Sequence, residues 1–183
     1  MLGCTLRTKL PERASLGLSS KIFTSRPSNT EGLFFAQMIV KSPENTKEWD
    51  SYYWLRWEIL RKPWNQPIGS ERDKLDEHLD SFHAMAVDDF NKVMGVARLH
   101  LVTPGNRAQI RFMAVNTQNQ AKGIGKLLIQ YLENVAKQNN VKEIILQARE
   151  NAVGFYIKEG YQVIEKSFVL YNQIQHYLML KTL

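Results

Sequence analysis

The stretch from residue 108 to residue 137 joins an apolar strand, a loop with two glycines and an amphipathic helix. Glycine is a poor helix former, yet Gly123 and Gly125 stand where this helix begins. Glycine at such a point lets another group come very close to the backbone. Because a helix start has free N–H groups and a partial positive charge, the favoured group is an anion. A tight turn between strand and helix, with no ligand, is the simpler alternative.

The helix after the glycines carries one apolar stripe, made of Ile124, Leu127, Leu128, Tyr131, Leu132 and Val135. The surrounding patterns predict the order β-α-α-β-β-β-α-β-α-β-β. Strands are expected at residues 37–40, 82–88, 92–102, 108–116, 143–148, 161–165 and 173–181. Helices are expected at residues 43–61, at 70–79 with Ser70 as a cap, after Gly125, and at 151–160. The strands between residues 82 and 116 form an antiparallel meander, because only short turns join them. We therefore predict one α/β (α+β) domain over residues 38–183.

The first 37 residues look unlike the rest of the chain. They are rich in Ser, Thr, Arg and Gly, poor in acids, and show no sustained periodicity. A mitochondrial-type targeting peptide, a disordered extension and a natural translation start at Met38 are all compatible with this composition. We favour the last two, because the segment lacks the clear amphipathic basic helix of a targeting peptide.

Charge and composition narrow the possible partners. The net charge is +6, and residues 1–37 hold five basic against two acidic residues, so the predicted domain carries only +3. No block of like charges appears, so we expect no nucleic-acid partner, whereas a polyanionic cofactor fits. No apolar run approaches the roughly 20 residues of a membrane-spanning helix, so we expect no membrane partner. The single cysteine, Cys4, fits a reducing compartment, and we expect a cytoplasmic location.

Two known phosphate motifs do not fit the glycine loop. A P-loop requires Ser or Thr after its Gly-Lys pair, and Leu127 follows Lys126 here. A Rossmann fingerprint requires a third glycine at position 128, which is Leu128.

The pattern Gln-x-x-Gly-x-Gly, read from Gln120, Gly123 and Gly125, resembles the acetyl-CoA motif of the GNAT superfamily of N-acetyltransferases. The segments "FMAV" before the loop and "NAVGFYIKEGY" after the next strand strengthen this resemblance, which covers residues 38–183. It implies a mixed, mainly antiparallel twisted sheet of about seven strands flanked by about four helices. Within the superfamily, "LRWEILRKPWNQPIGSERD" most resembles the ElaA-like bacterial acetyltransferases.

The resemblance also implies site residues. The loop amides would bind the pyrophosphate of acetyl-CoA, and the preceding strand would offer its backbone to the pantetheine arm. The implied donor-binding residues are Met113, Ala114, Val115, Gln120, Ala121, Lys122, Gly123, Ile124, Gly125, Lys126, Asn151 and Tyr156. In the family an asparagine often lies seven residues before the tyrosine, where this chain has Arg149. Asn151 is therefore either a donor contact or a helix N-cap.

Acetyl transfer to an amine needs a base for the amine and a proton donor for the departing thiolate. The resemblance implies that Tyr156 is the proton donor, although an aromatic residue in this helix is also suited to packing in the core. The candidate bases are His176, His83, His100 and Glu58, and the strand before the "FY" helix offers only Glu143 and Gln147. We favour His176, because the last two strands border the acceptor side in this fold.

The acceptor site should involve the helix over residues 43–61, the loop after it and the final strand pair. Trp54, Trp57 and Trp64 would form an aromatic wall, although for Trp57 we prefer a place in the core. Glu71 and Asp73 would hold a cationic substrate or cap a helix.

The predicted function is acetyl-CoA-dependent transfer to an amine of a small molecule or protein. A non-catalytic acyl-CoA sensor is the alternative, and a homodimer is compatible with either. We expect no metal site, because the four histidines, His78, His83, His100 and His176, lack ligand spacing.

Overall fold

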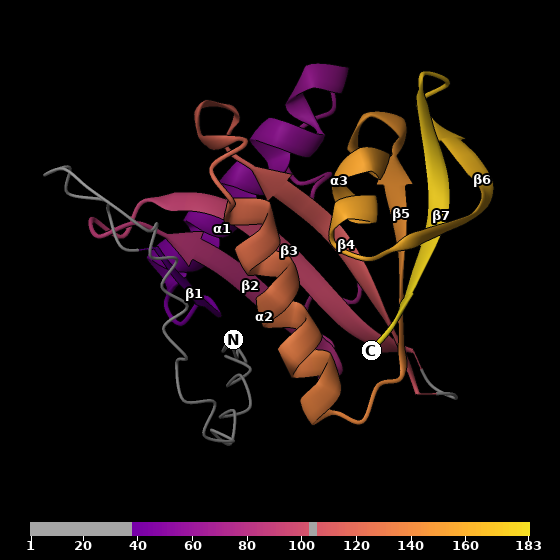
Figure 1. The fold of residues 1–183 in the computed structure, drawn as a ribbon. Coiled ribbons are helices and arrows are strands. Elements are labelled where there is room, and N and C mark those ends of the chain that lie inside the picture. The colour runs from indigo at the N-terminus through magenta and orange to yellow at the C-terminus, as the bar shows by residue number, and fades with distance from the viewer. Residues whose placement is uncertain (1–37, 103–105) are drawn as a thin grey trace, which may run out of the picture.

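The computed structural model describes residues 38–102 and 106–183, so the predicted extension and Cys4 lie outside the described residues. A seven-stranded sheet runs through the molecule in the order β1-β2-β3-β4-β5-β7-β6 (Figure 1). The strands are β1 (Ile39–Lys41), β2 (Ser81–Val87), β3 (Val93–Val102), β4 (Arg107–Val115), β5 (Glu143–Arg149), β6 (Gln162–Leu170) and β7 (Ile174–Thr182). The helices are α1 (Thr46–Leu60), α2 (Ile124–Gln138) and α3 (Val153–Lys158). Short 3-10 turns η1 (Lys62–Trp64), η2 (Thr117–Asn119) and η3 (Glu150–Ala152) connect them.

The predicted fold class is confirmed. Strands β1 to β4 form an antiparallel meander, and β5, β7 and β6 form a second antiparallel group. Only the junction between β4 and β5 is parallel, with α2 as its crossover. None of the helices in the described ranges is long and apolar enough to cross a membrane.

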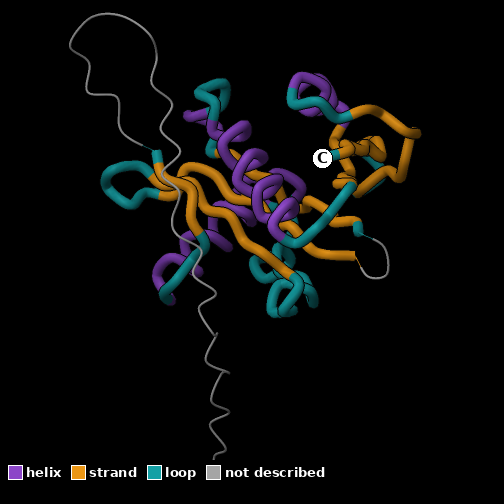
Figure 2. The backbone as a smooth tube through the Cα atoms, turned by 60° about the horizontal axis from the view of Figure 1, so that its bottom comes forward, coloured by secondary structure: helices purple, strands orange, loops and turns teal. Residues whose placement is uncertain are grey.

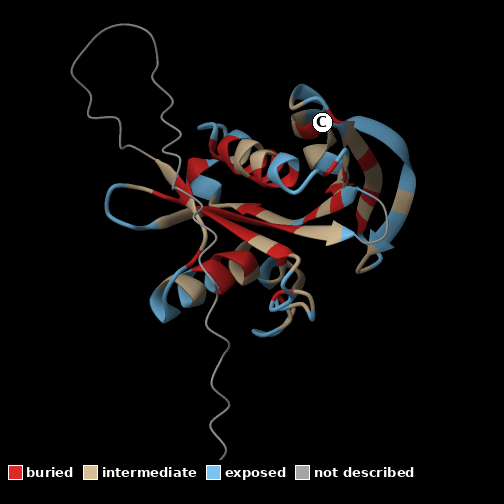
Figure 3. Ribbon diagram, turned by 90° about the horizontal axis from the view of Figure 1, so that it is seen from below, coloured by how far each residue is buried: buried red, intermediate tan, exposed pale blue. Residues whose placement is uncertain are grey.

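Helices cover both faces of the sheet (Figure 2). Along β2, Ala84 and Ala86 pack in the core under α2, whereas Met85 and Val87 pack under α1. This alternation is the period-2 pattern of a strand with both faces buried. We call the two sides the α1 face and the α2 face, and α3 lies on the α2 face. Figure 3 shows the buried residues concentrated between the sheet and these helices.

The helix predicted over residues 70–79 does not form, so three α-helices flank the sheet instead of four. Residues 70–80 form successive turns, in which aspartate side chains take backbone N–H groups that a helix would use. Asp76 Oδ2 accepts from Asp73 N at 2.8 Å, and Asp73 Oδ1 accepts from Leu75 N at 2.9 Å. Ser70 caps no helix, and its hydroxyl donates to the Pro67 carbonyl.

The sheet splits between β4 and β5. Residues 107–110 of β4 pair with residues 143–146 of β5, and the pairing stops there. Beyond this point the two strands diverge, as Figure 1 shows, while β4 stays paired with β3 and β5 with β7. Backbone N–H and C=O groups along both sides of the split therefore have no partner strand across it, and an extended ligand could use them.

Close packing of α2 on β3 depends on Gly95. A Cβ atom there would lie 2.8 Å from Ile124 Cγ2 and 3.0 Å from Leu128 Cδ1. We expect Gly95→Ala to lower the free energy of unfolding by about 1–3 kcal/mol, because one methyl group overpacks this contact. Gly154→Ala is the matched control, since no atom lies within 4 Å of that added Cβ, and it should be neutral or stabilise by up to about 1 kcal/mol. Urea unfolding of both variants checks this, and equal stabilities would contradict the packing.

Candidate active site

A cavity of about 920 Å³ occupies the split between β4 and β5. Its walls come from both faces of the sheet. Leu60 and Arg61, at the end of α1, line it on one face, and the start of α2 with Phe155 and Tyr156 of α3 lines it on the other. The cavity therefore passes from one face to the other between the diverging strands.

A β-bulge in β4 shapes the middle of this cavity. Val96 pairs with Ala114 and Arg98 with Arg111, so two residues of β4 lie opposite one residue of β3. Phe112, inside the bulge, has φ 56°, which is strained for a residue with a large side chain. Because of the extra residue, Arg111 and Phe112 both point to the α1 face, whereas Met113 and Val115 pack on the α2 face.

The glycine loop has the geometry of an anion site. Gly123 is the N-cap of α2 with φ 81° and no side-chain cap, so the first N–H groups of the helix stay free of such a partner. Ala121 also has positive φ, at 63°. A Cβ at Gly123 would meet no atom within 4 Å, so the loop faces open space. Gly125 has a different role, because its Cβ would lie 3.0 Å from Phe155 Cζ.

The structure brings the predicted site residues together. All of them line the cavity except Lys122, whose Nζ donates to Asn119 Oδ1 at 3.0 Å instead. Asn151 lines the cavity and is not the N-cap of α3, which is Ala152. The functions assigned to these residues remain predictions, which their positions allow.

Tyr156 is placed as a neutral phenol. Its side chain is buried between the rings of Phe155 and Tyr161, at centroid distances of 5.0 and 5.8 Å. Burial raises the pKa of the Tyr156 hydroxyl well above its ordinary value, and the nearby charge of Arg149 opposes this only in part. Within the described residues the hydroxyl makes no hydrogen bond. It is therefore a protonated group available to a ligand in the cavity.

His176 is placed as a neutral imidazole on the α1 face. It lies opposite Arg149 in the β5–β7 ladder, stacks on Phe168 at 4.6 Å and lines the cavity. Burial and the charge of Arg149 lower its pKa, against the opposing effect of the Ile174 carbonyl. That carbonyl lies 2.9 Å from Nδ1, so Nδ1 carries the proton and Nε2 keeps its lone pair.

The other candidate bases lie away from the cavity or are already paired. His83 is buried between Tyr52 and the Asp76 carbonyl, and burial lowers its pKa to about 4. His100 Nδ1 lies 3.0 Å from Ser81 Oγ. Glu143 pairs with Arg107 at 2.6 Å, where β4 and β5 are still joined. Glu58 borders a separate surface hollow. Gln147 does line the cavity, and its buried Oε1 has no hydrogen-bond partner among the described residues.

The aromatic wall and the cationic-substrate residues are not where the sequence placed them. Neither Trp54, Trp57 nor Trp64 lines the cavity. Trp57 is half-buried against the following loop, where its Nε1 donates to the Gln66 carbonyl at 3.0 Å. Glu71 is buried and accepts from Gly69 N at 2.7 Å, and Asp73 pairs with two arginines. These carboxylates bind groups of the protein itself and are therefore not free to bind a cationic substrate.

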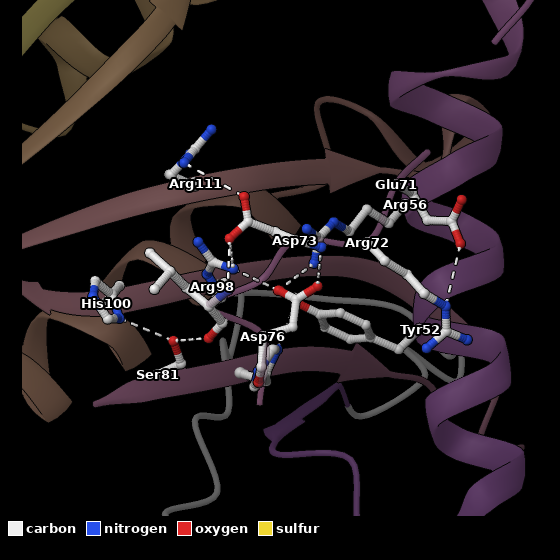
Figure 4. A network of polar contacts seen from close by, with 12 residues as sticks. Tyr52, Arg56, Glu71, Arg72, Asp73, Asp76, Ser81, Arg98, His100 and Arg111 are labelled. Atoms are coloured by element: carbon white, nitrogen blue, oxygen red, sulfur yellow. Dashed lines mark hydrogen bonds and ion pairs between the residues drawn. The ribbon is translucent and has the colours of Figure 1, made fainter. Parts of the chain in front are cut away.

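An arginine-rich network supports the α1 face of the cavity (Figure 4). Asp76 accepts from the fully buried Arg56 and Arg98 at 3.0 and 2.6 Å. Asp73 pairs with Arg98 at 3.1 Å and with Arg111 at 3.6 Å. The Arg56 guanidinium lies 3.4 Å from the centre of the Phe112 ring. The sequence did not predict this network, and its only signal there is that Arg56 and Arg98 stand inside apolar segments.

Within the described ranges, no group of three or more His, Cys, Asp or Glu side chains is arranged to hold a metal ion.

The fold is shared with solved acetyltransferases. An aminoglycoside 6′-N-acetyltransferase solved with coenzyme A superposes with a TM-score of 0.66 at 18% identity, covering 79% of this chain and 96% of that one. Escherichia coli ElaA superposes with a TM-score of 0.68 at 14% identity, covering 80% and 99%. At these identities the likeness shows a shared fold, and the placement beside ElaA-like enzymes rests on the sequence resemblance.

The sequence profile of the Acetyltransferase (GNAT) family matches residues 49–161, and the chain belongs to this family. YjcF of Bacillus subtilis strain 168, an uncharacterized N-acetyltransferase, is 30% identical over 144 residues, which cover 79% of this chain and 97% of that protein. The protein is thus an N-acetyltransferase, as the glycine motif predicted.

Proposed function

We propose that this protein transfers the acetyl group of acetyl-CoA directly to a primary amine of a small molecule or protein, within a complex that holds both substrates. The observation that carries the proposal is the cavity in the β4–β5 split. It joins the start of α2, which has no side-chain cap, on the α2 face to His176 on the α1 face.

The donor would bind on the α2 face. The uncapped start of α2 supplies N–H groups and a partial positive charge for its pyrophosphate, and Lys126 adds a full charge. The extended arm would lie in the split, where the backbone of β4 beyond Ile110 has no partner strand on that side. An aminoglycoside acetyltransferase of the same fold was solved with coenzyme A, which supports acetyl-CoA as the donor.

The reaction needs one group that accepts a proton and one that donates a proton, and the cavity has a candidate for each on opposite faces of the sheet. The amine nitrogen attacks the thioester carbonyl carbon, the N–C bond forms and the C–S bond breaks. His176 Nε2, with its free lone pair, would take the proton that the amine loses. The Tyr156 hydroxyl, protonated and unpaired, would give a proton to the departing sulfur.

We expect acetyl-CoA and CoA to bind, and Gly123→Glu to weaken both by at least about a hundredfold, because a carboxylate would then face the pyrophosphate. The strain of a side chain at φ 81° adds to this loss. Calorimetric titration measures it, with NAD as the comparison ligand. Gln138→Glu, at the other end of α2, introduces the same charge and should bind normally. A well-folded wild-type protein that binds no CoA would overturn the proposal.

Tyr156→Phe should lower kcat roughly tenfold to a hundredfold, because it removes the proton donor, whereas acetyl-CoA should still bind measurably, because the loop at Gly123 is unchanged. Release of CoA thiol with an accepted amine measures the rate. Tyr177→Phe is the control, since that hydroxyl is bonded to Glu150 at 3.2 Å outside the cavity. Unchanged turnover in Tyr156→Phe would exclude this residue as the proton donor.

The His176 assignment has a pH signature. A base must be neutral to act, so wild-type kcat should fall as the pH drops through the lowered pKa of His176, below its ordinary value of about 6.5. His176→Gln should lower kcat by roughly a hundredfold or more and remove this acid limb. His78→Gln, exposed and outside the cavity, should keep both the rate and the limb. If His176→Gln retains the limb, another group deprotonates the amine.

A further inference from the structure

The end of the cavity on the α1 face is lined by three arginines, Arg61, Arg111 and Arg149. Among the described residues that line the cavity, the single acidic one is Glu159. It is the C-cap of α3, on the α2 face. The anion loop at Gly123 also lies across the sheet from these arginines. Their charge is therefore separate from the site proposed for the donor phosphates.

Two of these arginines meet at one atom. Arg149 Nη2 donates to the Leu60 carbonyl oxygen at 3.2 Å, and Arg61 Nη1 donates to the same oxygen at 3.3 Å. The carbonyl end of α1 offers only a partial negative charge. Neither side chain pairs with a carboxylate in residues 38–102 or 106–183, so two like charges face each other beside the cavity.

The third arginine, Arg111, shares its acidic partner with another arginine. Arg111 lies 3.6 Å from Asp73, which already binds Arg98 at 3.1 Å. Within the described part of the chain, the fully buried Arg56 and Arg98 each keep two guanidinium nitrogens without a hydrogen-bond partner. Arg56, Arg61, Arg98 and Arg111 all surround the Phe112 ring, with Asp73 and Asp76 as the paired acids. The positive charge of these arginines exceeds the negative charge of the two aspartates that pair with them. Partial burial strengthens the electrostatic effect of this excess charge, because the protein interior screens it less than water does.

We propose that the acceptor amine belongs to a molecule that also carries an oxyanion, either a carboxylate or a phosphate, and that Arg61, Arg111 and Arg149 bind it. The inference rests on the proposed function and adds the class of acceptor. The planar guanidinium fork suits both oxyanions, and each arginine has N–H groups that no residue of the described chain uses. A polycationic amine is repelled by the same wall.

The first test needs no known acceptor. The melting temperature of CoA-saturated protein is measured against inorganic phosphate and against succinate, at constant ionic strength maintained with chloride. We expect a saturable increase with at least one probe, and the effective probe distinguishes phosphate from carboxylate. No saturable increase with either would overturn the inference. A protein that CoA itself fails to stabilise would instead refute the proposed function, so the two failures are distinct.

Arg111→Gln is the sharpest variant. Arg111 is 43% exposed in its side chain, and Asp73 keeps Arg98 as a partner after the substitution. The variant should keep the stabilisation by CoA and lose the stabilisation by the anion. Lys62→Gln removes an equal charge from the neighbouring η1 turn, outside the cavity, and should keep both. Anion stabilisation that survives in Arg111→Gln would overturn the assignment of this residue.

The second test compares matched acceptors. Amino acids are compared with their carboxamides, and aminoethyl phosphate with ethanolamine, by the release of CoA thiol. The acid-bearing member should have a kcat/KM higher by roughly tenfold to a hundredfold, as expected for a charged hydrogen bond. Arg111→Gln should raise the KM of that member and leave the KM of acetyl-CoA unchanged, which a general loss of structure would not do. Preference for the uncharged members would overturn the inference.

Discussion

The α1 face of the cavity depends on the interaction of the buried Asp76 carboxylate with two arginines. This interaction joins the turns after α1 to Arg56 of the helix and to Arg98 of β3. All three side chains are almost fully buried, so none can lose its partners without leaving an uncompensated charge in the interior. The cluster therefore fixes the turns at residues 70–80 and, through Arg98 and Arg111, ties them to β3 and β4.

The same cluster accounts for the strained residue in β4. The backbone of Phe112 is strained at φ 56°. A cation–π contact with the Arg56 guanidinium, 3.4 Å from the ring centre, offsets part of this strain. The bulge that results places Arg111 and Phe112 on one face. It also interrupts β4 next to the point where β4 leaves β5. Cavity, bulge and buried charges are thus parts of one local arrangement.

The sequence predicted the glycine loop, the seven strands and the crossover helix because their signals are local. Glycine spacing, strand alternation and the α2 stripe need no knowledge of distant residues. The helix predicted at residues 70–79 was wrong because the aspartates there form ion pairs with Arg56, Arg98 and Arg111. These arginines are distant in the sequence, so local patterns do not show the pairing. For the same reason the sequence did not predict that Arg61 lies beside Arg149, because the two meet only after folding. The sequence named Tyr156 and His176 as candidates, and both line the cavity, but the position of the proton on His176 could be assigned only from its contact with the Ile174 carbonyl.

The contact between Gly125 and Phe155 has a consequence for how such sequences can change. The ring of Phe155 occupies the space that a side chain at position 125 would fill, and Tyr156 follows it directly. The second glycine of the motif therefore sets the distance between α2 and α3, and through it the place of the tyrosine. Among relatives, a larger residue at position 125 should accompany a smaller one at position 155. The two positions should therefore change together, although they lie 30 positions apart in the sequence.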